Sequence, residues 1–229
     1  MIPEPPALPP ASPLPPIPWE ERERHGALHA FVETLRLFVL APQEAFARTR
    51  EGGDLASPLL WTMICSALGV VAAQTWSLLL GPLAWLPLLP GELREQWVGS
   101  VLALLVGLLL TPVMAIVGLF VGAAVVHLFL WMFGGLTDSR SGYEGTVRAI
   151  AYSSIAQIAN VVPFVGWLAA VVWSVVLQTM GLVRLHRATP GRAVAAVLMP
   201  LVLCCAALLL FFAMLAALIA GLLAGFGSK

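Results

Sequence analysis

The sequence is poor in charge. Of its 229 residues only 10% are Asp, Glu, Lys or Arg, whereas 60% are hydrophobic. A soluble globular domain has about 25% charged and about 45–50% apolar residues. Basic and acidic residues number 12 each, so no net positive charge is available to attract nucleic acid. The composition is typical of a polytopic membrane protein whose main partners are membrane lipids.

Motifs for metal binding and catalysis are also missing. The three cysteines, Cys65, Cys204 and Cys205, lie in apolar runs without Cys-x-x-Cys spacing, and the histidines form no His-Glu-x-x-His motif. We interpret the cysteines as small packing residues, and we expect no metal and no cofactor. Gly-Lys-Ser/Thr and Gly-x-Ser-x-Gly are absent as well, so we expect no phosphate-binding loop and no enzyme.

The N-terminal part is polar and rich in proline. Nine prolines within residues 1–18 favour an extended chain, and we predict a disordered cytoplasmic tail over residues 1–25. The stretch lacks the basic start and apolar core of a signal peptide. Residues 26–57 read as an amphipathic helix and turn at the membrane surface. The apolar residues that recur there at helical spacing are Leu28, Phe31, Val32, Leu35, Phe38 and Val39.

Residues 58–225 form the predicted membrane domain, an all-α bundle of five transmembrane helices. The predicted spans cover residues 59–80, 98–133, 147–162, 164–183 and 193–223. The second is long enough to be one helix that projects or kinks at Pro112, or two spans that turn there. If the second span is a single helix, ten of the twelve basic residues lie on the same side of the membrane as the N-terminus. The positive-inside rule then favours five spans, a cytoplasmic N-terminus and a C-terminus outside.

Polar residues gather in the third predicted span and beside it. The candidate intramembrane cluster consists of His127, Tyr152, Ser153, Gln157 and Asn160. Ser153, Gln157 and Asn160 are four and three residues apart, so on an α-helix they form one stripe that lipid cannot satisfy. We interpret the stripe as packing between helices. The alternatives are a groove for a lipid headgroup or partner helix, and a serine hydrolase that pairs His127 with Ser153 or Ser154.

The segment between the second and third spans is polar and contains Asp138, Arg140 and Glu144. Gly134 and Gly135 are expected to end the second span, and Ser141 with Glu144 matches a capping box at the next helix start. Two Gly-x-x-x-Gly pairs, Gly118–Gly122 and Gly221–Gly225, indicate close helix packing. A candidate cytoplasmic basic face comprises Arg140, Arg148, Arg184, Arg187 and Arg192.

The order of these features resembles the Yip family of integral membrane proteins, in its bacterial branch. The resemblance runs from about residue 31 to residue 200 and includes "LAPQEAF", "HLFLWMFGG" and "GYEGTVRAIAYSS", followed by "GLVRLHRATPGRA". It implies a five-span bundle without known catalysis, located here in a bacterial inner membrane. Eukaryotic relatives bind Ypt/Rab GTPases, but their "DLYGP" string is absent here, so GTPase binding is not carried over.

These observations lead to a functional hypothesis and a rival. The favoured hypothesis is a non-enzymatic scaffold that organises the membrane or binds a cytoplasmic protein partner through its basic face. The rival is a small transporter or lipid-moving protein with a polar groove between spans two, three and four, lined by His127, Gln157 and Asn160. No Asp, Glu, Lys or Arg lies near the middle of a span, which counts against a proton-coupled carrier.

Overall fold

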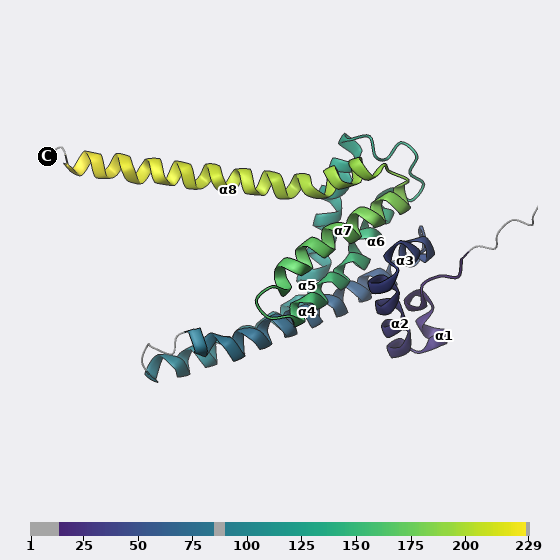
Figure 1. Cartoon of the computed structure of the whole chain (residues 1–229), viewed down its shortest axis with the longest axis horizontal. Coiled ribbons are helices and arrows are strands. Elements are labelled where there is room, and N and C mark those ends of the chain that lie inside the picture. Colours follow the sequence, from purple (N-terminus) through teal and green to yellow (C-terminus); the bar gives the residue numbers. More distant parts are fainter. Residues whose placement is uncertain (1–13, 85–89, 228–229) are drawn as a thin grey trace, which may run out of the picture. The chain divides into compact units, whose positions relative to one another are not determined.

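The protein is described by a computed structural model that covers residues 14–84 and 90–227. All the regular elements in these ranges are helices, which confirms the predicted all-α class for the described part of the chain. The chain divides into two compact units, Met1–Arg50 and Glu51–Lys229. Figure 1 shows the helices in chain order and gives their labels.

The first unit contains four short helical elements. They are η1 (Pro18–Glu21), α1 (Arg22–His25), α2 (Ala27–Leu40) and α3 (Pro42–Arg48). Aromatic rings hold them together: Phe38 meets Phe46 edge-on at a centroid distance of 5.1 Å, and Trp19 meets Phe31 at 6.0 Å. The Trp19 amide N–H donates to Thr34 Oγ1 over 2.9 Å. Such ring pairs bury much apolar area for few residues.

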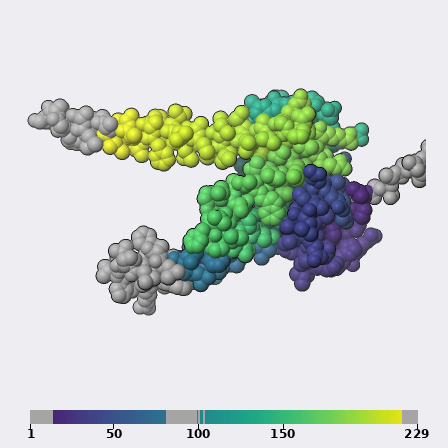
Figure 2. Space-filling view, in the orientation of Figure 1, coloured from purple at the N-terminus to yellow at the C-terminus, as the bar shows by residue number. Residues whose placement is uncertain are grey.

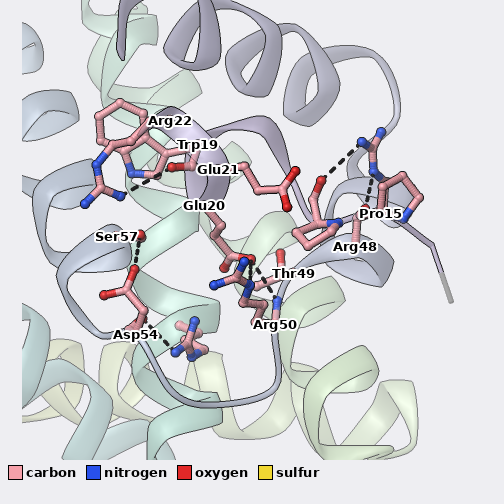
Figure 3. A network of polar contacts seen from close by, with 12 residues as sticks. Pro15, Trp19, Glu20, Glu21, Arg22, Arg48, Thr49, Arg50, Asp54 and Ser57 are labelled. Carbon is pink, nitrogen blue, oxygen red and sulfur yellow. Dashed lines mark hydrogen bonds and ion pairs between the residues drawn. The ribbon is translucent and has the colours of Figure 1, made fainter. Parts of the chain in front are cut away.

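The predicted disordered tail, residues 1–25, extends too far along the chain, because residues 18–25 are helical. Residues 1–13 lie outside the described part of the chain, but η1 and α1 are helical and Trp19 is buried. Polar contacts fix this segment, as Figure 3 shows: Arg48 donates through Nε to the carbonyl of Pro15 over 3.0 Å, and the Arg50 amide donates to Glu20. The many prolines indicated disorder for the whole segment. In the structure, however, the buried side chain of Trp19 holds its C-terminal part in place.

Helix α2 does not present its apolar residues on one face. Ala30, Thr34 and Phe38 are buried and pack within the first unit. By contrast, Leu28 is 78% exposed and Val32 is 47% exposed, although both are apolar. The helix therefore has a second apolar stripe that the described chain leaves uncovered.

The second unit carries the membrane-spanning helices. Its elements are α4 (Ala56–Ala84), α5 (Pro90–Met132), α6 (Gly142–Ser153), η2 (Ser154–Val161), α7 (Gly166–His186) and α8 (Pro190–Gly227). Within the described residues, α4, α5, α7 and α8 are the four that are long and apolar enough to cross a membrane. The second predicted span is one continuous helix, α5, with Pro112 inside it. The reading of two spans with a turn at Pro112 is therefore wrong.

The third predicted span is built differently from the other four. Its first residues, 147–153, belong to the twelve-residue helix α6, and residues 154–161 form the 3-10 helix η2. These two elements pack against α4 and α7, and α6 also packs against α5. Runs of 3-10 helix longer than three or four residues are uncommon and often mark a hinge or local strain. Phe164, just after η2, has φ of 63°, which is unfavourable for a bulky side chain.

The helix ends follow from local chemistry. The Asp54 carboxylate accepts from the Ala56 amide over 2.8 Å and also binds the Ser57 hydroxyl, which caps the start of α4 (Figure 3). Gly134, with φ of 67°, follows the end of α5, as predicted from the Gly134–Gly135 pair. A left-handed residue, Arg187, ends α7. Pro190 then occupies the first position of α8, where its missing N–H costs nothing.

The apolar core lies where α5, α6, α7 and the start of α8 meet. Its fully buried members include Leu130 from α5, Ala149 from α6, Leu182 from α7 and Ala193 from α8. The later part of α8 is different: residues 201–219 are all exposed, and Figure 2 shows this stretch in yellow. A helix that is apolar on all sides and covered by no protein suits a lipid environment.

Candidate functional site

A chain of hydrogen bonds joins three helices of the second unit. Thr146 Oγ1 on α6 lies 2.7 Å from His127 Nδ1 on α5 and 2.9 Å from His186 Nε2 on α7. The other ring nitrogen of His186, Nδ1, lies 2.7 Å from the Ser139 hydroxyl in the loop before α6. The His127 and His186 rings have centroids 5.9 Å apart. His127 thus bonds Thr146 of α6, a residue that was not part of the predicted cluster.

Thr146 couples the two imidazole rings chemically. A hydroxyl has a single proton, so between neutral rings Thr146 donates to one nitrogen and accepts an N–H from the other. When Thr146 donates to His127, His186 Nε2 carries a proton and donates it to Thr146, and Ser139 donates to His186 Nδ1. In the opposite arrangement, His127 Nδ1 donates to Thr146, Thr146 donates to His186 Nε2, and His186 Nδ1 donates to Ser139. Both arrangements satisfy every hydrogen bond. His186 and Thr146 are fully buried, so each bond avoids an unsatisfied polar group.

The loop between α5 and α6 is tied to the neighbouring helix ends. Ser141 donates its hydroxyl proton to the carbonyl of Leu185 over 2.7 Å, and Arg192 donates to the carbonyl of Gly134 over 2.8 Å. Ser141 is at the predicted N-cap position of α6, but its side chain makes no capping bond. The predicted capping box is therefore wrong, because Ser141 bonds α7 and Glu144 bonds an arginine instead.

That arginine, Arg148, is buried rather than part of a basic surface. Its side chain donates to Glu144 Oε1 over 2.7 Å and to the carbonyl of Asp54 over 2.8 Å. Its relative exposure is 0%. One turn of α6 separates Glu144 and Arg148, so the pair forms along the helix while the guanidinium reaches the start of α4. Arg148 therefore belongs to the packing of α6 on α4, which corrects its assignment to the basic face.

The other four arginines of the predicted basic face are exposed. Arg140 lies in the loop before α6, Arg184 and Arg187 lie at the end of α7, and Arg192 lies in the first turn of α8. The bonds of Ser141 and Arg192 bring these three segments together. Within the described ranges, no acidic side chain forms an ion pair with any of the four. We call Arg140, Arg184, Arg187 and Arg192 the basic face.

Tyr152 and Ser153 lie in the packed interior. Tyr152 is fully buried against Trp61 of α4, and its carbonyl accepts the Trp61 indole N–H over 3.4 Å. The Ser153 hydroxyl donates to the carbonyl of Ala149, one turn earlier in its own helix. Thus neither residue contacts His127, and the predicted five-residue cluster divides into separate places. Ser154 also bonds a backbone carbonyl, that of Ala151.

Gln157 and Asn160 remain together, on η2. A 3-10 helix has three residues per turn, so side chains three apart are aligned. The Asn160 amide accordingly donates to Gln157 Oε1 over 3.1 Å. The same period places Ser154, rather than Ser153, in line with Gln157. The predicted stripe assumed 3.6 residues per turn, and the tighter helix shifts its first member by one residue.

These two amides line a groove of about 350 Å³. Helix α4 contributes Ser66 and Gly69, α5 contributes Thr111 and Met114, and η2 contributes Gln157 and Asn160. His127 and α7 are not among the lining residues, so the groove lies between predicted spans one, two and three rather than two, three and four. The sequence reading found its amides but assigned it to the wrong set of helices.

The glycines that permit close packing are not those of the Gly-x-x-x-Gly pairs. A Cβ at Gly69 would lie 2.8 Å from Cβ of Gln157, and a Cβ at Gly166 would meet the carbonyl of Ala159. At Gly118 and Gly122 nothing lies within 4 Å. The side chains of residues 220–229 lie outside the described part. Likewise, Cys65 is buried as predicted, but Cys204 and Cys205 are exposed and pack against no other helix.

The predicted pairing of His127 with Ser153 or Ser154, as in a serine hydrolase, is not formed in the structure. Ser153 and Ser154 donate to backbone carbonyls and not to His127. Ser139 does contact His186, but the second ring nitrogen of His186 faces the Thr146 hydroxyl rather than a carboxylate that could orient it. Sequence reasoning missed Ser139, Thr146 and His186 as bonding partners. No local signal in the sequence indicates these contacts, because they join residues 19 to 47 positions apart.

Long apolar helices joined by buried hydrogen bonds define this chain as an α-helical integral membrane protein. The family model of the Yip1 domain matches residues 36–212, so the chain belongs to the Yip1 domain family, in agreement with the resemblance. No curated protein and no solved structure matches the chain.

Proposed function

We propose that the protein is a non-enzymatic membrane scaffold that binds anionic lipid headgroups through its basic face. The observation that supports this most directly is the exposure of Arg140, Arg184, Arg187 and Arg192 on three connected segments. A basic residue near an anionic membrane surface contributes about 1 kcal/mol. Four such residues would favour anionic over zwitterionic lipid by about 4 kcal/mol, roughly a thousandfold.

The interior polar residues support the same proposal, because their hydrogen bonds are already made within the protein. In the described part of the chain, every buried side-chain nitrogen and oxygen has a hydrogen-bond partner. His127, Thr146, His186 and Arg148 are thus used to hold helices together. Since these interior groups are satisfied, the groups available to an outside partner are those of the surface. A cytoplasmic protein with an acidic patch is a further candidate for the basic face.

The proposal includes five membrane crossings, with α6 and η2 together as the third. Twelve residues at about 1.5 Å and eight at about 2.0 Å give a length of about 34 Å. A hydrocarbon core is about 30 Å thick, so this pair is long enough to cross it. The polar residues Thr146, Arg148 and Ser153 of α6 are buried among the neighbouring helices, which explains why a less apolar segment can lie there.

Five crossings place the basic face and the N-terminus on one side of the membrane and the C-terminus on the other. The positive-inside rule makes the first side cytoplasmic, and we assign the protein to a bacterial inner membrane from its resemblance to that branch of the family. In this arrangement the exposed stripe of α2, with Leu28 and Val32, lies at the headgroup level of the same leaflet.

The test compares lipid retention by variants of the intact protein. Arg140, Arg184, Arg187 and Arg192 are changed together to Gln, and in a matched variant to Lys. The protein is extracted from a mixed membrane, and the bound lipids are measured by native mass spectrometry. The Gln variant should lose most of its anionic lipid, whereas the Lys variant should keep it because the charge remains. Equal retention by the wild type and the Gln variant would overturn the proposal.

A transporter or lipid-moving role is the second candidate, and the groove beside η2 favours it. The polar amides of Gln157 and Asn160 face a space of about 350 Å³ next to spanning helices. Flux or lipid flipping in liposomes should fall when these two residues are changed to Leu. His127→Leu serves as a comparison, because His127 does not line the groove. Unchanged flux in the first variant would remove this candidate.

A further inference from the structure

The groove beside η2 has polar groups with unused hydrogen-bonding capacity. Gln157 accepts from Asn160, which leaves the Gln157 NH₂ and the Asn160 carbonyl oxygen without a bond among the described residues. The Ser66 hydroxyl likewise has no bonding partner in this part of the chain. By contrast, Thr111 donates to the carbonyl of Gly107 over 2.6 Å. The groove therefore offers a donor, an acceptor and a hydroxyl that lipid tails cannot satisfy.

The walls of the groove exclude a charged ligand group. None of its lining residues is ionisable; apart from the polar groups above they are small or apolar, such as Val70 and Met114. A buried charge without a counter-charge is costly. The basic face does not contribute, since none of its arginines lines the groove. The preferred occupant has an uncharged polar group and an apolar remainder.

The depth of the groove narrows the choice further. Helix η2 ends at Val161, five residues before Gly166, where the 21-residue span of α7 begins, so Gln157 and Asn160 lie near one end of that span. At about 1.5 Å per residue, α7 is about as long as the hydrocarbon core is thick, so its first residue lies near the edge of the core. Trp76 of α4 donates its indole N–H to the carbonyl of Val161 over 2.9 Å, which places the groove residues of α4 just inside the same edge. The groove thus lies close to the level of lipid ester groups.

We propose that this groove binds the glycerol-ester region of an uncharged acylglycerol, such as a diacylglycerol. Its ester carbonyls would accept from the Gln157 amide, and its free hydroxyl would donate to the Asn160 carbonyl oxygen. The acyl chains would continue along Val70 and Met114 into the bilayer. A volume of about 350 Å³ is at the lower end for a small-ligand pocket and suits the polar region with its first methylenes.

The 3-10 geometry of η2 is what creates the site. In η2 the two amides are aligned one turn apart, whereas an α-helix would separate them by 60° around the axis. Gly69 allows α4 to approach Gln157 closely from one side, and Gly166 allows α7 to approach Ala159 and Asn160 from the other. The inference names a ligand for the groove of the second candidate function, and it does not require that the ligand be moved.

The experiment uses the full-length protein in phosphatidylcholine nanodiscs with two photoactivatable lipids of the same acyl chains, a diacylglycerol and a phosphatidylcholine. Mass spectrometry then locates the labelled peptides. The diacylglycerol should label α4 and η2 several-fold more than α8, and the phosphatidylcholine should show no such preference. Equal labelling of the groove by both lipids would overturn the assignment to an uncharged headgroup.

Variants make the result specific to the groove. Changing Gln157 and Asn160 to Leu should reduce diacylglycerol labelling at least fivefold, whereas Gln178→Leu, on α7 outside the groove, should leave it unchanged. Met114→Trp should fill the groove while Gln157 and Asn160 stay unchanged. It should reduce diacylglycerol labelling as much as the double variant does. Unchanged labelling in both folded groove variants would refute the site. Lipid retention at the basic face is measured separately, so either proposal can fail alone.

Discussion

Thr146 is the residue on which the packing of α5, α6 and α7 depends most. Thr146→Val keeps the shape but removes both bonds to the histidine rings, which leaves buried polar nitrogens unsatisfied. An unsatisfied buried group costs about 1–3 kcal/mol, so the free energy of unfolding should fall by about that amount. Denaturation in mixed micelles measures the change. Thr146→Ser should preserve most of the stability, because the hydroxyl remains.

A matched control separates this effect from a general intolerance of Thr→Val. Thr179 on α7 donates only to the carbonyl of Val175 in its own helix. Thr179→Val should therefore change the stability much less than Thr146→Val. If both variants were equally stable, the bridge between the two histidines would not contribute to the fold.

At the residue scale, the sequence identified polar positions better than it identified their partners. His127 was grouped with polar residues of the third predicted span, whereas its bonding partner is Thr146, which lies just before that span. Arg148 was assigned to the basic face because it lies at the predicted cytoplasmic end of the third span. Its burial depends on Glu144 one turn away and on the carbonyl of Asp54, 94 residues earlier in the chain. Such a distant contact cannot be predicted from local spacing.

At the scale of elements, the contact between α4 and η2 requires a glycine. Gly69→Ala would place a methyl group 2.8 Å from Cβ of Gln157 and 3.2 Å from its carbonyl oxygen. Overpacking of this kind costs about 1–3 kcal/mol, so the variant should unfold at lower denaturant concentration. Gly118→Ala is the matched control, since nothing lies within 4 Å there. The control should be neutral or slightly stabilising, because alanine favours a helix.

Helix α2 makes a second prediction at this scale. Spin labels at Leu28→Cys and Val32→Cys, in a protein whose three native cysteines are changed to Ala, should be more accessible to oxygen than to a polar nickel complex. A label at His29→Cys, on another face, should show the opposite preference. This pattern follows if the exposed apolar stripe lies in the headgroup region. Nickel accessibility at all three positions would place α2 in water.

The helices themselves could be predicted because long apolar runs, a Gly-Gly stop and a proline start are local signals. Helix α5 was expected as one helix on charge placement, and the structure agrees. The 3-10 form of η2 could not be predicted, because its sequence is compatible with an α-helix. It arises where Gly69 and Gly166 let α4 and α7 approach its backbone closely. The predicted groove was assigned to the wrong helices for the same reason, since its position depends on which helices flank η2.

At the scale of the whole molecule, the number of crossings determines where the ends of the chain lie. Within residues 14–84 and 90–227, four helices meet the criteria of length and apolarity, and four crossings would leave both termini on one side. With α6 and η2 as a fifth crossing, the termini lie on opposite sides. Alkaline phosphatase is active only outside the cytoplasm, so a fusion at the C-terminus should be active and one at the N-terminus inactive. Two inactive fusions would indicate four crossings.

We propose that the interior polar residues maintain the fold while the exposed basic face carries the function. Anionic lipid retention by the intact protein, compared between Thr146→Val and the four-arginine Gln variant, separates these two roles. Thr146→Val should be less stable but should retain anionic lipid while folded. The Gln variant should be as stable as the wild type and should lose that lipid. If the Gln variant kept its anionic lipid, the basic face would not carry the function.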